Sequence, residues 1–195
     1  LVITWDSNGN GGFTGARIAY NLASASGDDG IVLHHHTNGV VEYNMIVAVN
    51  DGITVSGRDA PSSFVNRVSD GNTISNNEIT GGTGGSPHGG IYVYDSFNTT
   101  ISGNNIHDYA GNGITFGLRN AAGNGQQPGG LITDNIIEDV GRNGIDVLQS
   151  GVTIKENTIS EADGYAISVG ANYAGGTNAT KPTGVVIEDN VFADN

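Results

Sequence analysis

Side chains that could act on a ligand recur at matching positions of a repeated motif. The pattern Gly-Ile-x-Val/Leu/Phe begins at residues 30, 52, 90, 113 and 144, and alignment on its isoleucine places polar and aromatic residues in columns. The aligned candidates are His34, His35, His36, Arg58, Tyr92, Tyr94, Asp95, Arg119 and Asp146. Aromatic rings beside acids and bases are typical of a groove that binds sugar, because the rings stack on apolar sugar faces.

The two arginines of this set predict the charge of the ligand. Arg58 and Arg119 fall in one column two repeats apart, about 10 Å if the repeats stack as paired strands. A polyanionic sugar chain running along the stack would meet them in turn. The simpler alternatives are that both arginines are solvated charges, that one histidine of the run points inward, and that Tyr92 and Tyr94 pack against a loop.

A second pattern, apolar-x-x-Asn-x-apolar, alternates with the first and defines the repeat length. Its six asparagines are Asn44, Asn77, Asn104, Asn135, Asn157 and Asn190. They are separated by 33, 27, 31, 22 and 33 residues (77−44, 104−77, 135−104, 157−135, 190−157). The shortest interval therefore predicts a coil of 22 residues, and the longer intervals predict the same coil with a loop inserted.

These two patterns predict an all-β, right-handed, single-stranded parallel β-helix of about 6–7 coils. Alternating strands send the apolar residues into the core, and stacked coils align isoleucine over isoleucine. We expect the asparagine to occupy a left-handed corner and to bond the equivalent asparagines above and below, and the glycine before isoleucine to make the next corner. An antiparallel sandwich gives no reason for an asparagine three residues after the same isoleucine six times.

The repeat predicts a single domain over residues 1–195. Residues 27–195 carry the clear repeats, whereas residues 1–26 are either irregular or a first coil with Ile18 in its core. The connections that follow Ile53, Ile114 and Ile167 are about twice as long as the others. Three long loops are therefore expected on one edge of the solenoid, where loops of repeat proteins usually form the binding surface.

Acidic residues form two further columns beside the asparagine motif. Asp134 and Glu156 stand in one column, and Asp139 and Glu161 stand in the other. Stacked carboxylates repel one another unless a cation bridges them, and Ca²⁺ prefers oxygen ligands. These four residues are the candidate Ca²⁺ ligands, and the alternative is a solvated acidic face that keeps the solenoid soluble.

Composition limits the classes of partner. The chain has 7 Lys+Arg against 20 Asp+Glu and a formal charge of −13, which argues against nucleic acid and anionic membranes as partners. No apolar run approaches the roughly 18 residues of a membrane span. Acidity and a low lysine content favour a secreted or cell-surface protein.

The combined pattern Ile-x-x-Asn-x-Ile and Gly-Ile-x-Val resembles the repeat of carbohydrate-active right-handed β-helix proteins, over about residues 27–195. That group includes mannuronan C5-epimerases and β-helical polysaccharide lyases. The stretch from Asn104 to Ile114 is similar to the epimerase catalytic module. Ser86-Pro87-His88 is the nearest match to the Asp-Pro-His motif of the epimerases, with serine in place of the aspartate.

The resemblance implies an acidic, uronate-containing polysaccharide as substrate, modified by C5 epimerisation or β-elimination. Such chemistry needs a cation to neutralise the substrate carboxylate, a base at C5 and an acid on the opposite sugar face. Arg58 and Arg119, or Ca²⁺, are the expected neutralising groups. The expected acid and base come from His34, His88, Tyr92 and Tyr94, and the expected substrate contacts are His36, Asp95, Asp146 and Tyr173.

A different class of function is also consistent with the repeat. A non-catalytic cell-surface, adhesin or filament-forming β-helix would show the same core pattern. The first and last coils of the sequence show no obvious cap, which predicts either end-to-end self-association or continuation into further coils.

Overall fold

The computed structural model describes residues 3–4, 13–24, 29–47, 50–57, 69–82, 89–117, 129–170 and 181–195. All regular structure in these ranges is β-strand, and every strand pair is parallel. Within the same ranges, no helix has the length and hydropathy needed to cross a membrane.

The described strands form four parallel sheets, which we name A to D. Sheet A contains β1 (Ile3–Thr4), β5 (Ile31–His34), β9 (Ile53–Ser56), β13 (Gly89–Tyr94), β17 (Asn112–Gly117), β20 (Ile145–Val147) and β23 (Ile167–Val169). Sheet B contains β2 (Phe13–Thr14), β6 (His36–Thr37), β10 (Ser69–Asp70) and β14 (Ser96–Phe97).

Sheets C and D follow the asparagine motif along the chain. Sheet C contains β3 (Arg17–Ala19), β7 (Val40–Glu42), β11 (Thr73–Ser75), β15 (Thr99–Ser102), β18 (Gly130–Thr133), β21 (Val152–Lys155) and β24 (Val186–Glu188). Sheet D contains β4 (Leu22–Ser24), β8 (Met45–Val47), β12 (Glu78–Thr80), β16 (Asn105–Tyr109), β19 (Ile136–Val140), β22 (Thr158–Ala162) and β25 (Val191–Ala193).

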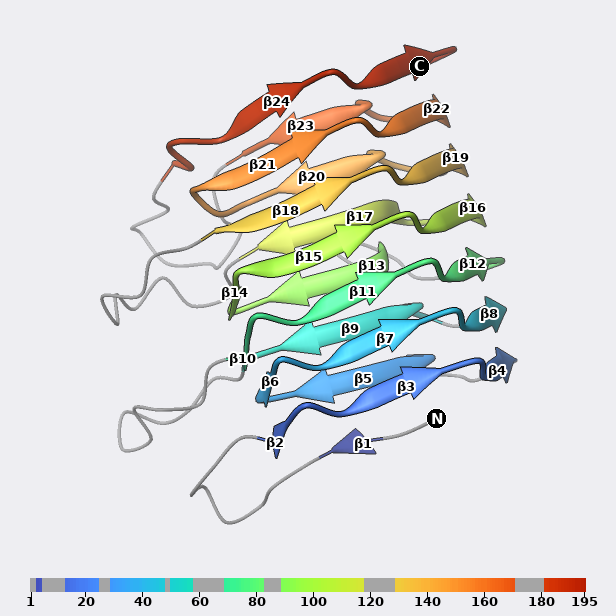
Figure 1. Cartoon of the computed structure of the whole chain (residues 1–195). Helices are drawn as coiled ribbons and strands as arrows, with labels where there is room; N and C mark the ends of the chain where they lie inside the picture. Colours follow the sequence, from blue (N-terminus) through green and yellow to red (C-terminus); the bar gives the residue numbers. More distant parts are fainter. Residues whose placement is uncertain are drawn as a thin grey trace.

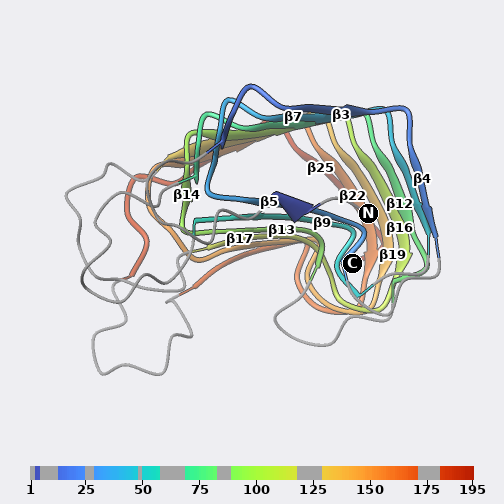
Figure 2. The same cartoon turned by 90° about the horizontal axis from the view of Figure 1, so that it is seen from below.

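One coil passes through the sheets in the order A, B, C and D, and the next coil stacks on it. Figure 1 shows the coils rising in sequence order from the N-terminus to the C-terminus. Seen along the axis, sheet A forms one side of the coil and faces sheet C, and sheet D forms a further side (Figure 2). The predicted parallel β-helix is therefore confirmed, with Ile18 of β3 paired to Val41 of β7 in an additional first coil.

Columns of isoleucine and valine fill the interior as the repeat predicts. In sheet D, Ile79 pairs with Ile46 and Ile106, and all three side chains are fully buried. Sheets A and C contribute matching columns to the same core. Burying one such side chain stabilises the fold by about 1.5–3 kcal/mol, so the aligned columns supply the main driving force for stacking.

The predicted asparagine ladder is present at the corner between sheets C and D. Asn77 donates from its backbone nitrogen and from Nδ2 to Oδ1 of Asn104, at 3.0 and 2.9 Å. Asn104 donates in the same way to Asn135. Nδ2 also donates to backbone carbonyls, such as that of Ile74 in the case of Asn104. The amides therefore satisfy buried backbone groups that have no partner within the sheets at this corner.

The left-handed corner belongs to the residue before each ladder asparagine, which corrects the expectation from sequence. The members of this corner column have φ between 53° and 64°: Tyr20, Tyr43, Asn76, Gly103, Asp134, Glu156 and Asp189. A left-handed conformation costs an ordinary L-residue roughly 1–2 kcal/mol. The ladder asparagine that follows compensates, because its backbone and side-chain amides bond the equivalent asparagines of the coils on both sides.

The glycine before each sheet-A isoleucine also has a different role from the expected one. None of these glycines has a left-handed φ. At Gly113, an added Cβ would lie 2.5 Å from Cγ2 of Ile137 and 2.6 Å from the carbonyl oxygen of Gly144. The glycine is therefore required for close packing of sheet A on the sheet-D isoleucines, not for a turn.

Candidate functional site

The outer face of sheet A carries the candidate residues in the expected register. Its first column runs Val32, Thr54, Tyr92, Thr115, Asp146 and Ser168, each paired to the next. The second column aligns His34, Ser56, Tyr94 and Gly117. The two columns lie side by side because alternate residues of each strand face outward.

The aromatic centre of this face is the pair Tyr92 and Tyr94 on β13. Their ring centroids are 5.0 Å apart at an interplanar angle of 38°. Tyr92 is buried and Tyr94 is half-buried, so Tyr94 is the ring that a ligand can reach. Ser56 is the register partner of Tyr94, and its Oγ hydrogen-bonds Nδ1 of His34 in the coil before, which fixes the orientation of the imidazole.

Asp146 on β20 adds a carboxyl group to the same face. Burial raises the pKa of this carboxyl, and a hydrogen bond with Ser168 opposes the increase. Asp146 therefore retains a proton at a higher pH than an exposed aspartate does. A carboxyl of this kind can either donate a hydrogen bond or exchange a proton with a ligand.

Asp95 lies at the end of β13, where the chain turns from sheet A toward sheet B. Its φ of 49° places it in the left-handed region, as does the φ of 51° at His35 two coils away. Asp95 is half-buried, whereas His35 is buried. Because both residues lie at the corner and not within a strand, Asp95 and His35 do not belong to the outward columns of sheet A.

His36 lies in the interior and not in the expected groove. Its side chain is fully buried on β6, and burial lowers the pKa of its imidazole. In the next coil Thr37 pairs with Asp70, and the backbone nitrogen of His36 donates to Oγ of Ser69. Alignment of the sequence on the sheet-A isoleucines puts Arg58 in the column of His36, and the pairing of β10 with β6 contradicts that alignment because Ser69 follows His36 instead.

Four of the candidate residues lie outside the part of the chain that the structure describes. These are Arg58, His88, Arg119 and Tyr173. His88 immediately precedes Gly89, the first residue of β13. Their assignments as neutralising, acid-base and substrate-contact residues remain predictions.

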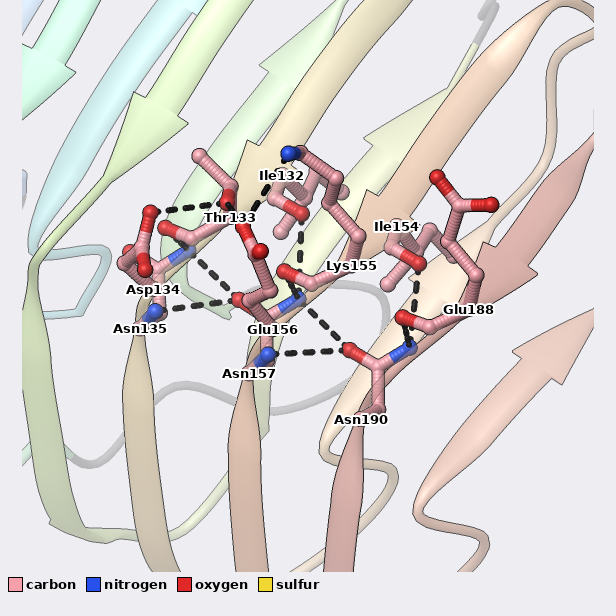
Figure 3. A network of polar contacts seen from close by, with 10 residues as sticks. All are labelled: Ile132, Thr133, Asp134, Asn135, Ile154, Lys155, Glu156, Asn157, Glu188 and Asn190. Carbon is pink, nitrogen blue, oxygen red and sulfur yellow. Dashed lines mark hydrogen bonds and ion pairs between the residues drawn. The ribbon is translucent and has the colours of Figure 1, made fainter.

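The acidic residues form two separate pairs. Figure 3 shows Asp134 and Glu156 at the corner between sheets C and D, where Oγ1 of Thr133 donates to Asp134 at 2.8 Å. Lys155 pairs with Glu156 through Nζ at 3.0 Å. Asp139 and Glu161 occupy left-handed positions within β19 and β22, at the other end of sheet D. No group of three or more His, Cys, Asp or Glu residues among those described is arranged to hold a metal ion.

Two polar arrangements were not anticipated from the sequence. Asn112 and Asn143 form a second amide column, in which Asn112 Oδ1 accepts from the backbone nitrogen of Asn143 at 3.1 Å. The Asn-Gly-Ile and Asp-Gly-Ile triplets of the sequence could have indicated this column.

His107 bonds Glu78 through Nε2 at 2.5 Å and Asp108 through Nδ1 at 2.7 Å, which raises the pKa of its imidazole. Nothing in the sequence spacing indicated this cluster.

Comparison with known proteins agrees with the geometry. The family described as the right-handed β-helix region matches residues 3–180, which is most of the chain. A search of curated proteins found no match. A search of solved structures likewise found none. The chain belongs to the right-handed β-helix family.

Proposed function

We propose that this protein binds a uronate-containing polysaccharide along the outer face of sheet A and modifies it by C5 epimerisation or β-elimination. The observation that carries the proposal is the placement of His34, Tyr94 and Asp146 on one face of sheet A, on strands β5, β13 and β20 that lie two coils apart along the solenoid. An imidazole, a phenol and a partly buried carboxyl provide acid-base groups beside an aromatic surface that suits a sugar ring.

The proposed reaction begins with removal of the proton at C5 of a uronate residue. The electron pair moves toward the adjacent carboxylate, so a neighbouring positive charge lowers the barrier. In β-elimination the C4–O bond then breaks, a C4–C5 double bond forms and the leaving oxygen takes a proton. In epimerisation a proton returns to C5 from the opposite sugar face. We assign the base and acid to the set His34, His88 and Tyr94. Tyr92, the fourth candidate, is buried and packs against the Tyr94 ring.

This acidic chain has few positively charged side chains that could neutralise a uronate carboxylate. Arg58 and Arg119 are proposed to neutralise the uronate carboxylate, and Ca²⁺ is the alternative. Substrate contacts are proposed for Asp95, Asp146 and Tyr173. A secreted or cell-surface location would give such a protein access to polymeric substrates.

The test is an assay on alginate and polygalacturonate, each with Ca²⁺ and with a chelator. The ultraviolet absorbance of the unsaturated product reports elimination, and deuterium uptake at C5 from heavy water reports epimerisation. Tyr94→Phe, His88→Ala and Arg119→Ala should each lower turnover about tenfold or more, the scale of losing one acid-base or electrostatic group. Tyr165→Phe, an exposed tyrosine outside sheet A, is the matched control.

Unchanged rates in all three variants would contradict the proposed residues. Absence of both reactions with both polymers would contradict the catalytic proposal itself. Retained polymer binding under that outcome would leave a polysaccharide-binding role for the sheet-A face.

A second candidate function is a non-catalytic structural solenoid. The observation in its favour is the continuous isoleucine core and asparagine ladder, which a structural scaffold needs as much as an enzyme does. Concentration-dependent end-to-end assembly in size-exclusion chromatography, with no activity on either polymer, would favour this role.

A further inference from the structure

Two tyrosines occupy the left-handed corner column where the other coils have small or polar residues. Tyr20 and Tyr43 have φ of 60° and 53°, and 72% and 48% of their surfaces are exposed. The following coils have Asn76 and Gly103 at this corner, which are residues that adopt left-handed backbone readily. The tyrosines therefore bear a conformational cost without the compensation of core burial.

The two rings are held together as a flat stack. Their centroids are 5.3 Å apart and their planes differ by 4°. Arg17 lies over the Tyr20 ring at 5.7 Å, and its Nε donates to Oε1 of Glu42 at 2.5 Å. Stacking offsets part of the cost of the corner, but a single exposed pair does not recover the cost of two left-handed tyrosines.

Large apolar side chains continue the surface beside the rings. Leu22 and Met45 pair across β4 and β8 and are 66% and 49% exposed. In the third coil the corresponding positions are Asn76 and Glu78, so the patch ends after two coils. Figure 2 shows β3 and β4 meeting at an outer corner of the coil, which makes this patch convex.

The size and chemistry of the patch favour one occupant. Four side chains on a convex corner fall well short of the roughly 800 Å² that each partner contributes to a standard protein interface. An anionic phospholipid surface is disfavoured by a net charge of −13, by Glu42, which pairs with Arg17, and by Glu78, which follows Met45 in the next coil. An exposed aromatic stack beside a guanidinium and a carboxylate matches a sugar, which has an apolar ring face and hydroxyls at its rim.

We propose that the Tyr20–Tyr43 corner is a second carbohydrate-contact surface. A pyranose ring of a polysaccharide packs on the tyrosine stack, and its hydroxyls bond Arg17 and Glu42. This surface lies at the corner of sheets C and D, whereas the proposed catalytic face is on sheet A. It is therefore independent of that reaction and would hold a long polymer elsewhere on the solenoid.

The experiment is affinity gel electrophoresis of the whole chain in gels containing hydroxyethyl cellulose, xylan, alginate or polygalacturonate. Wild type should be retarded by at least one polymer. The double variant Tyr20→Asn with Tyr43→Asn should lose at least fivefold in affinity. Its melting temperature should stay unchanged or increase, because asparagine fits the left-handed corner better. Tyr165→Asn, which removes an equally exposed tyrosine elsewhere, should leave retardation unchanged.

The combination of lost binding with retained or increased stability distinguishes a binding surface from a folding role. A clear fall in melting temperature of the double variant would show that the tyrosines serve the fold, and would overturn the proposal. No retardation of wild type by any of the four polymers would also overturn it. Sedimentation of wild type with phosphatidylcholine vesicles, lost in the double variant, would instead identify a lipid-contact surface. Tyr94→Phe in the same gels separates failure of this surface from failure of the sheet-A face.

Discussion

His36 places an ionisable ring in the interior of the solenoid. Among the described residues neither ring nitrogen has a hydrogen-bond partner, and burial lowers the pKa of the ring below 6.5. The neutral form is therefore the one that the folded state accommodates. Stability is full above the unfolded-state pKa and is lost as the pH falls from there toward the folded-state pKa.

We expect urea unfolding to give a lower free energy of unfolding at pH 5 than at pH 7.5, with part of the loss due to His36. His36→Leu should reduce this acid sensitivity because the replacement carries no titrating group. An identical pH slope in wild type and variant would show that the ring is ionised without penalty in the folded protein.

The pKa of His107 is shifted in the opposite direction to that of His36. The hydrogen bond to Asp108, followed by that to Glu78, raises the pKa of its imidazole. Its contribution to stability is full below the unfolded-state value of 6.5 and is lost as the pH rises through the folded-state pKa. His107→Gln should therefore lower the free energy of unfolding more at pH 5.5 than at pH 8.5, as measured by urea denaturation. A larger difference at pH 8.5 would contradict the ion-pair assignment.

The asparagine ladder ties sheets C and D together between coils. Asn104→Ala leaves the buried backbone nitrogen of Asn77 and the carbonyl of Ile74 without these partners. Unsatisfied buried groups cost about 1–3 kcal/mol each, so we expect a loss of about 3 kcal/mol in urea denaturation. Asn190→Ala, on the more exposed last coil, is the control and should cost clearly less. Equal losses of unfolding free energy at both positions would show that burial of the ladder does not determine the cost.

The close packing of sheet A on sheet D predicts that a methyl group added at its glycines destabilises the fold. Gly113→Ala inserts a methyl group against Cγ2 of Ile137 and the Gly144 carbonyl, and overpacking of this kind costs about 1–3 kcal/mol. At Gly170 an added Cβ would find its nearest neighbour at 3.8 Å, the Cδ2 of Leu148. Gly170→Ala should therefore change the melting temperature far less. Similar shifts for both variants would show that sheet A relaxes freely.

The elements were largely predictable from sequence because one local pattern controls each of them. Ile74, Asn77 and Ile79 show the case, since two isoleucines must face inward and the amide must bond across coils. The sequence-based predictions that were wrong concern residues whose role depends on the neighbouring coil. Gly113 resembles a turn residue in isolation, and its packing role emerges only when Ile137 is placed beside it.

The candidate site was predictable only where strands fix it. Tyr92 and Asp146 fall in register because each pairs with Thr115 of β17. His36 was misplaced because Ser69 and not Arg58 follows it in the next coil, and the point where an insertion begins has no periodic signal. The His107 cluster depends on side chains from two coils that no single repeat contains.

At the scale of the whole molecule, repulsion among carboxylates is the main electrostatic feature. The net charge is −13, and Asp108 and Asp139 stand on adjacent coils. Sodium chloride shortens the Debye length from about 30 Å at 0.01 M to about 8 Å at 0.15 M. We expect the melting temperature to rise by about 3 °C over this range, equivalent to about 1 kcal/mol. Calcium chloride at equal ionic strength tests the expected Ca²⁺ sites, which predict a further increase. A melting temperature that falls with salt would contradict net repulsion.

The asparagine ladder also gives the solenoid a chemical direction. Every rung donates from its N–H groups toward the following coil and accepts at Oδ1 from the preceding coil, as Asn44, Asn77 and Asn104 illustrate. The aligned amide dipoles polarise one another along the stack. The N–H donors and the Oδ1 acceptors of the ladder therefore point in opposite axial directions, while Nδ2 also donates to a backbone carbonyl of the preceding coil, as Asn104 does to Ile74. A coil that continues the ladder must therefore run in the same direction as the coils before it.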